Sequence, residues 1–209
     1  MLFTLNFGFK GYDPNDILES FIPLSFKRKT MNIRQLIRQR RRELSLAQRN
    51  NAQTIIYQKI KKHPAVNQAQ HIAIFLSFDG EIDTKPIIEY LWQQNKSVYL
   101  PVPVADHQLL FLNYTPKTPL IKNKFGILEP AVDETNSITI EQLDIVFTPL
   151  VAFDERGYRM GMGGGYYDRA LANYQKQQIL PIGLAFACQK VTKLDNQPWD
   201  IKLPEIIYA

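Results

Sequence analysis

Residues 144–169 read DIVFTPLVAFDERGYRMGMGGGYYDR, an apolar run followed by a glycine-rich turn. The run 144–153 predicts a buried strand, and the composition of 166–177 predicts a helix. Glycines let backbone N–H groups converge on an anion, and a helix N-terminus adds partial positive charge. The stretch therefore favours a phosphate site, although a turn needed only for tight strand-to-helix packing would have the same composition.

Charged residues on both flanks of the glycines favour a metal–nucleotide complex over a bare turn. Arg159 precedes the glycines, and Asp168 and Arg169 follow them. The motif is not a Walker loop, because Gly165 is followed by Tyr166 instead of Lys and Ser or Thr. It also lacks the acidic residue that reads the ribose in dinucleotide-binding folds.

Strand-like and helix-like segments alternate along most of the chain, which predicts an α/β sandwich with a largely parallel sheet. Ligands of such sheets bind beyond the carboxyl ends of the strands, so we expect the loops after Phe78, Phe153 and Phe186 to meet at one cleft. The expected helices are 31–63, one that runs from an N-cap at Asp83 or Thr84 to about 95, a short 139–143 and 166–177. The expected strands are 71–78, 97–104, 109–114, 144–153, 180–186 and 205–208, and 115–137 is expected to be a loop.

Three acidic residues stand in or near these loops. Glu81 is either a solvated turn residue or a carboxylate that holds the N–H edge of a heterocycle. Asp168 is either a first-turn helix acid or a magnesium ligand beside phosphates, and Asp200 is a candidate second ligand.

Composition sets the class of protein. The chain has 209 residues with 45% hydrophobic side chains, enough for one substantial core. We expect 31–209 to be a single catalytic domain and 1–30, which has no sustained period, to be a peripheral extension. Cys188 is the only cysteine, which predicts a reducing, cytoplasmic location without disulfides. No apolar run approaches the length of a membrane span.

The net charge of +5 is concentrated in one segment, where five arginines lie within 34–42. On a helix they would surround an apolar stripe, and a solvated basic face is one interpretation. The alternatives are an RNA-binding patch or one or two arginines that reach a polyphosphate. No aromatic residues alternate with the arginines, which weighs against nucleic acid.

Six motifs in order resemble the 5-formyltetrahydrofolate cyclo-ligase family, also called 5,10-methenyltetrahydrofolate synthetases. The resemblance spans about residues 33–207. Its motifs are IFLSFDGEIDT at 74–84, VYLP at 98–101, FGILEP at 125–130, FTPLVAFD at 147–154, the glycine-rich segment 159–169, and PIGLAF at 181–186.

The resemblance implies a three-layer α/β sandwich like that of the sugar-phosphate isomerases and CoA transferases. It implies ATP- and Mg²⁺-dependent closure of 5-formyltetrahydrofolate, with or without a polyglutamate tail, to 5,10-methenyltetrahydrofolate. In the family's scheme ATP phosphorylates the formyl oxygen, N10 attacks the activated carbon, and ADP and phosphate leave. No nucleophilic side chain is needed, because the protein places the γ-phosphoryl group and neutralises charge.

The family's residue roles transfer to matching positions. The resemblance implies catalytic roles for Arg159, Tyr167 and Asp168, and Mg²⁺ ligation by Asp168 and Asp200. The implied ATP contacts are Arg34, Arg38, Arg159, Gly161, Met162, Gly163, Gly164, Gly165, Tyr166, Tyr167 and Asp168, and the implied folate contacts are Leu76, Glu81, Phe125, Met162, Gly164 and Tyr166.

Two departures from the family pattern concern the nucleotide. The family's N-terminal lysine position falls on Thr30, with Lys29 beside it, so Arg34 or Arg38 would have to supply the charge. Met162 and Gly164 replace basic residues of some members, so phosphate binding relies more on backbone amides. The rival functions are an isomerase or CoA-transferase-like enzyme, which needs a base or glutamate that this chain does not mark, and a basic RNA-binding protein.

Overall fold

The computed structural model describes residues 32–123 and 126–209, and 33–209 form one compact unit. The predicted extension 1–30, with Lys29 and Thr30, lies outside the described residues, as does Phe125. Within the described part of the chain, none of the helices has both the length and the apolar character needed to cross a membrane.

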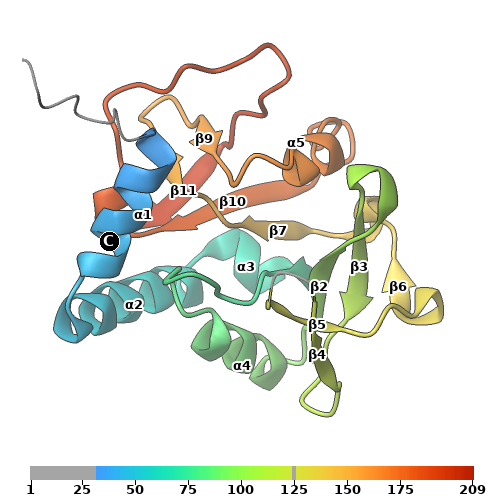
Figure 1. Ribbon diagram of the computed structural model, residues 1–209. Helices are drawn as coiled ribbons and strands as arrows, with labels where there is room; N and C mark the ends of the chain where they lie inside the picture. The colour runs from blue at the N-terminus through green and yellow to red at the C-terminus, as the bar shows by residue number, and fades with distance from the viewer. Residues whose placement is uncertain (1–31, 124–125) are drawn as a thin grey trace, which may run out of the picture. The chain divides into compact units, whose positions relative to one another are not determined.

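A seven-stranded mixed sheet forms the centre, in the order β11-β10-β7-β1-β2-β3-β6 (Figure 1). The strands β1, β2, β7, β10 and β11 are parallel, and β3 and β6 are antiparallel to their neighbours. The bounds are β1 His71–Ala73, β2 Ser97–Pro103, β3 Leu109–Asn113, β6 Ser137–Ile138, β7 Ile145–Thr148, β10 Leu180–Ala185 and β11 Glu205–Tyr208.

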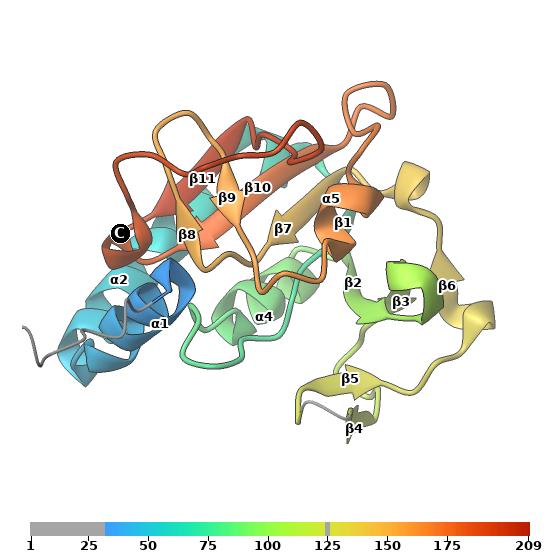
Figure 2. The ribbon, with the colours of Figure 1, turned by 45° about the horizontal axis from the view of Figure 1, so that its top comes forward.

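Helices α2, α3 and α4 cover one face of the sheet, and the glycine-rich segment with α5 lies over the other (Figures 1 and 2). Ile56 of α2 and Leu91 of α4 share one buried core with residues of β1, β7 and β10, whereas Leu171 and Leu203 pack on the opposite face with Ala73 and Val146. This arrangement confirms the three-layer α/β sandwich with a largely parallel sheet. The helices are α1 Ile33–Glu43, α2 Leu46–Lys61, α3 Pro64–Gln68, α4 Lys85–Gln93 and α5 Tyr166–Ala170.

The single long helix expected over 31–63 is wrong, because Ser45 starts a new helix. Its side chain accepts a hydrogen bond from the Gln48 backbone, and the Gln48 side chain accepts one from the Ser45 N–H. This reciprocal capping box ends α1 and allows α2 to take another direction. At the far end, His63 caps α3, in which Pro64 is the first residue.

The expected strands 97–104, 109–114, 180–186 and 205–208 are confirmed as β2, β3, β10 and β11, but several other expected segments were too long or too simple. The strand expected over 144–153 ends at Thr148, before Pro149, and 152–153 instead form β8, Ala152–Phe153, which pairs with β9, Arg159–Met160. The first strand stops at Ala73, and the helix after the glycines stops at Ala170. The expected loop 115–137 contains the hairpin β4, Leu120–Lys122, and β5, Leu128–Pro130. Single-turn 3₁₀ segments occupy η1 Ala105–His107, η2 Glu134–Asn136, η3 Ile140–Gln142 and η4 Ala187–Gln189.

Candidate active site

The glycine loop, residues 161–165, joins β9 to α5 and has an unusual backbone. Gly163 has φ +105°, which L side chains rarely adopt, and no heavy atom lies within 4 Å of the place where its Cβ would stand. At Gly161, too, no heavy atom lies within 4 Å of the place where a Cβ would stand. At Gly164 a Cβ would lie 2.7 Å from the ring of Tyr166. The backbone here is therefore open to a ligand on one side and closely packed by an aromatic ring on the other.

Arg34 connects α1 to this loop. Its Nε donates a hydrogen bond to the Gly161 carbonyl oxygen at 3.0 Å, so α1 carries a cation to the edge of the loop. Arg38, one turn later, is placed differently from the expectation. Its Nε donates to Asp79 Oδ2 at 2.6 Å. Of the two arginines of α1 expected at the nucleotide, the structure brings Arg34 to the glycine loop and engages Arg38 with the loop that follows β1.

Asp168, in the first turn of α5, is held by two donors at one oxygen. Its Oδ1 accepts from Arg159 Nη1 at 3.0 Å and from the Ile201 N–H at 3.3 Å. The Arg159 side chain is 3% exposed and also donates to the Ile201 carbonyl at 3.2 Å. This network brings Asp168 beside the segment that contains Asp200, although Asp200 Oδ2 itself accepts from the Gln197 N–H at 2.7 Å.

The two aspartates fit Mg²⁺ only as part of a larger oxygen set. No group of three or more His, Cys, Asp or Glu side chains able to hold a metal occurs within 32–123 and 126–209. Mg²⁺ is usually held by one or two carboxylates, waters and phosphate oxygens, so this donor set suits an ion that arrives with a nucleotide. Within the part of the chain that the structure describes, the hydrogen bonds to Asp168 go to Oδ1, which leaves Oδ2 for coordination.

Asp79 gathers three arginines of α1. Arg38, Arg41 and Arg42 all contact its carboxylate, and its backbone has φ +50°. Burial alone would raise the pKa of Asp79, but hydrogen bonds from Arg38 and Arg42 and the surrounding positive charge lower it to about 2. Most of the arginine cluster is therefore used to fasten α1 to the loop after β1, instead of forming a free basic face.

Glu81 follows in the same loop and is largely buried, with 14% of its side chain exposed. Burial, the largest influence, raises its pKa to about 7, while a hydrogen bond from the Phe78 N–H and the charge of Arg41 oppose the rise. The hydroxyl of Tyr167 lies in the same environment. Its pKa is raised by burial and then by the Glu81 carboxylate, with Arg159 acting in the opposite direction. Tyr167 of α5, Arg159 of β9 and Glu81 of the loop after β1 are therefore close enough to interact electrostatically.

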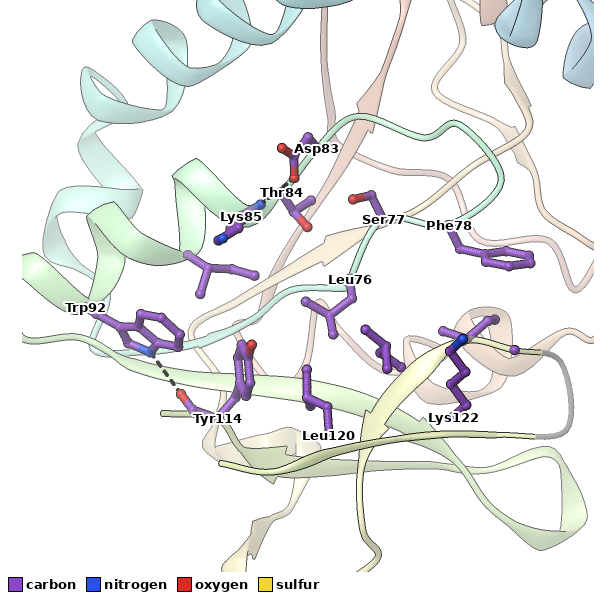
Figure 3. A pocket seen from close by; sticks show the side chains of 14 residues that line it. Leu76, Ser77, Phe78, Asp83, Thr84, Lys85, Trp92, Tyr114, Leu120 and Lys122 are labelled. Carbon is purple, nitrogen blue, oxygen red and sulfur yellow. Dashed lines mark hydrogen bonds between the residues drawn. The ribbon is translucent and has the colours of Figure 1, made fainter. Parts of the chain in front are cut away.

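A cavity of about 510 Å³ lies beside this loop, between α4 and the β4–β5 hairpin. Figure 3 shows Leu76 inside it, with Trp92 and Tyr114 toward one end and Lys122 toward the other. The Trp92 indole N–H donates to the Tyr114 carbonyl at 2.9 Å, which fixes the ring. Leu76 was expected at the folate. Phe125 lies outside the described residues, but its neighbours Gly126, Ile127 and Leu128 line the cavity.

His107 was not expected at the site. Its ring lies 5.5 Å from that of Tyr166, which places the turn between β2 and β3 against α5. Both Asp106 and His107 have φ +56°. A lone histidine after a strand carries no motif, so only the pairing of the two rings in space identifies it. The cavity residues Trp92, Tyr114 and Lys122 were also not expected, because they come from separate segments that carry no motif and meet only in the folded structure.

The model of the 5-formyltetrahydrofolate cyclo-ligase family matches residues 26–209. The chain belongs to this family. The 5-formyltetrahydrofolate cyclo-ligase of Haemophilus influenzae is 48% identical over 181 residues, which cover 86% of this chain and 97% of the relative. That of Escherichia coli K12 is 47% identical over 174 residues, 82% and 96% of the two chains.

Solved structures agree with the family assignment. A 5,10-methenyltetrahydrofolate synthetase from Mycoplasma pneumoniae superposes with a TM-score of 0.67 at 28% identity, covering 84% of this chain and 95% of the other. The synthetase of Aquifex aeolicus gives a TM-score of 0.72 at 28% identity, covering 84% and 87%. The resemblance of the six motifs is therefore confirmed, and the chain is a ligase of the cyclo-ligase family.

Membership in the cyclo-ligase family makes the spatial grouping of the expected residues informative. The glycine loop, Tyr166, Tyr167 and Asp168 are contiguous, and Arg34, Arg159 and Glu81 reach them from three other segments. Met162 lies at the loop surface and is 57% exposed. Arg38 stands apart, paired with Asp79. The individual binding and catalytic roles stay predictions.

Proposed function

We propose that the chain closes 5-formyltetrahydrofolate to 5,10-methenyltetrahydrofolate with ATP and Mg²⁺, releasing ADP and phosphate. The observation that carries the proposal is the meeting of two kinds of site. An open glycine loop with Arg34 at its edge suits a triphosphate, and the adjoining loop after β1 presents a largely buried carboxylate, Glu81, beside an apolar cavity.

The glycine loop and its arginines would hold ATP. Backbone N–H groups around Gly161 and Gly163 are accessible where side chains would otherwise stand, and they can donate to phosphate oxygens. Arg34 adds a cation at the rim. Bound Mg²⁺ would neutralise phosphate charge and orient the γ-phosphoryl group, with Asp168 and Asp200 as its protein ligands. Arg159 fixes the Asp168 carboxylate at Oδ1.

The loop after β1 and the cavity would hold the folate. The Glu81 carboxylate accepts hydrogen bonds, which matches the N–H donors along one edge of a pterin. The cavity walls are mostly apolar and aromatic and suit the flat rings of the substrate. Lys85 and Lys122 line the same cavity, and their charges suit the glutamate carboxylates of a folate, including those of a polyglutamate tail.

The attacking atoms all belong to the substrate, so the protein has to align the folate with ATP and does not need a nucleophilic side chain. The formyl oxygen attacks the γ-phosphorus, the bond from that phosphorus to the bridging oxygen breaks, and ADP leaves. The N10 lone pair then attacks the formyl carbon, the C–O bond breaks, phosphate leaves, and the N10 proton is lost to give the methenyl bridge. The closely packed Tyr166 and Tyr167 between the two binding regions would exclude water from the activated intermediate.

An absorbance assay tests the proposal directly. Formation of 5,10-methenyltetrahydrofolate from 5-formyltetrahydrofolate is followed with ATP and Mg²⁺, without ATP, and with Mg²⁺ chelated. We expect product only in the complete mixture, with ADP formed in equal amount. Product without ATP, or ATP hydrolysis without product, would reject the assigned reaction.

A further inference from the structure

Arg41 is the most unusual side chain of α1, because it is a cation with only 1% of its side chain exposed. Its Nη2 donates to the Asp79 carbonyl at 2.8 Å and to Asp79 Oδ2 at 3.0 Å. Its Nε and Nη1 are buried without a hydrogen-bond partner among the described residues. Unsatisfied buried donors on a charged group are costly, and the contacts with Asp79 use only Nη2 of this side chain.

Asp79 does not require Arg41 for its own neutralisation. Arg38 and Arg42 contact the same carboxylate from the same helix. The unpartnered side of Arg41 lies toward Glu81 instead, with Nη1 3.9 Å from Glu81 Oε1. This separation is an ion pair without a hydrogen bond, and the other carboxylate oxygen, Oε2, accepts from the Phe78 N–H at 3.1 Å.

We propose that Arg41 is a positioning residue for the folate: its Nη1 charge keeps the Glu81 carboxylate ionised and oriented toward the substrate. The inference rests on the proposed role of Glu81 in binding the pterin edge. Arg41 is too buried to touch a ligand itself, so it acts only through Glu81. It thereby couples α1, which also reaches the glycine loop through Arg34, to folate recognition.

The charges around Glu81 define the direction of the effect. Within the loop of Glu81, the hydrogen bond from the Phe78 N–H lowers the pKa of Glu81, and the charge of Asp79 raises it. From α1, the charge of Arg41 lowers this pKa. Tyr167 of α5 stays neutral because its own pKa is raised. With burial included, the pKa of Glu81 is about 7. Removal of the Arg41 charge must raise this pKa further, so less carboxylate is present near pH 7.

The test measures the affinity for 5-formyltetrahydrofolate without ATP, by calorimetry, between pH 6 and pH 9. The variant Arg41→Met removes the charge and keeps similar length, Arg41→Lys keeps the charge, and Arg42→Met removes another Asp79 partner that is 57% exposed. If the pKa of Glu81 rises by one unit, the ionised fraction at pH 7 falls from about one half to about one eleventh, a loss of roughly five-fold in affinity.

We expect Arg41→Met to lose about five-fold in folate affinity at pH 7 and to approach the wild-type value at pH 9. Arg41→Lys should restore part of the loss, and Arg42→Met should follow the wild-type pH profile. In a Glu81→Gln background, Arg41→Met should add nothing. A loss that is constant with pH, or one that adds to the Glu81→Gln loss, would show a structural role and overturn the proposal.

Two further measurements separate this proposal from the proposed reaction. Melting temperatures of all variants, compared with the wild type, identify any that fail to fold; if Arg41→Met does, Arg41→Gln, which also removes the charge but keeps polar atoms for Asp79, carries the test. If Glu81→Gln leaves folate affinity unchanged, Arg41 has nothing to act through and the proposal fails. Wild-type protein that binds the folate but forms no product with ATP would reject the reaction and leave the Arg41 result intact.

Discussion

Asp168→Asn tests whether the acid after the glycine loop holds Mg²⁺ on the phosphates of ATP. The amide keeps an oxygen in the place of Oδ1, so it still accepts from Arg159 and the Ile201 N–H. What it loses is the charge beside an arginine that is 3% exposed. The change therefore removes charge with little change in shape.

Asp168→Asn should have a small effect on the free energy of unfolding and a large effect on turnover. Exchange of a charge-assisted hydrogen bond for a neutral one costs about 1–2 kcal/mol of unfolding free energy. For a domain of this size that lowers Tm by roughly 3–6 °C, so the variant remains folded. Turnover should fall on the order of 100-fold, equivalent to about 3 kcal/mol, because a neutral oxygen is a poor ligand for Mg²⁺.

The assay follows methenyl product at saturating folate and ATP while Mg²⁺ is varied from limiting to excess. Asp168→Asn should require more Mg²⁺ and still reach a lower maximum. Asp195→Asn, an exposed acid in the same C-terminal segment, serves as the matched control and should change neither value. Near-wild-type turnover of Asp168→Asn at limiting Mg²⁺ would refute metal ligation and leave Asp168 only as the partner of Arg159.

Three other substitutions probe the remaining parts of the site. Glu81→Gln should raise the KM for the folate much more than that for ATP, by a free energy on the order of 1.5–3 kcal/mol; equal effects on both would indicate a structural role. Gly164→Ala should weaken the binding of both ATP and the folate, because a Cβ would lie 2.7 Å from the Tyr166 ring. Unchanged KM values for both substrates would contradict that packing. Arg34→Ala should weaken ATP binding both in the full chain and after deletion of residues 1–30. The deletion itself should leave Tm almost unchanged, and a large fall in Tm would show that 1–30 is not a peripheral extension.

The fold was predictable because its central strands are short apolar runs separated by helical segments. Ile72, Val146 and Ile182 lie in such runs and are fully buried in the sheet. Segment ends were less predictable. The pattern Ser45-x-x-Gln48 is a visible capping box, but it lies inside a long stretch of helical composition. Pro149 is a visible strand breaker, but it lies inside an apolar run. The β4–β5 hairpin has too few residues to show a period.

The site was predictable where motif residues are contiguous, as in the glycine loop with Asp168. It was not predictable where partners meet only through folding. Residue type does not distinguish Arg41 from Arg40 or Arg42, yet Arg41 is buried and Arg42 is 57% exposed. The helix register decides this, because Arg41 lies one turn after the buried Ile37 and on the same face of α1.

Helix α1 joins the two halves of the proposed reaction. At its first turn Arg34 binds the Gly161 carbonyl of the glycine loop, and two turns later Arg41 faces Glu81. Asp79, which binds three arginines of α1, fastens the helix to the loop that carries Glu81. A shift of α1 on binding of ATP would therefore carry with it the loop that holds Glu81, the carboxylate proposed to bind the folate. Since coupling between sites is reciprocal, a saturating folate must then change the affinity for ATP by the same factor.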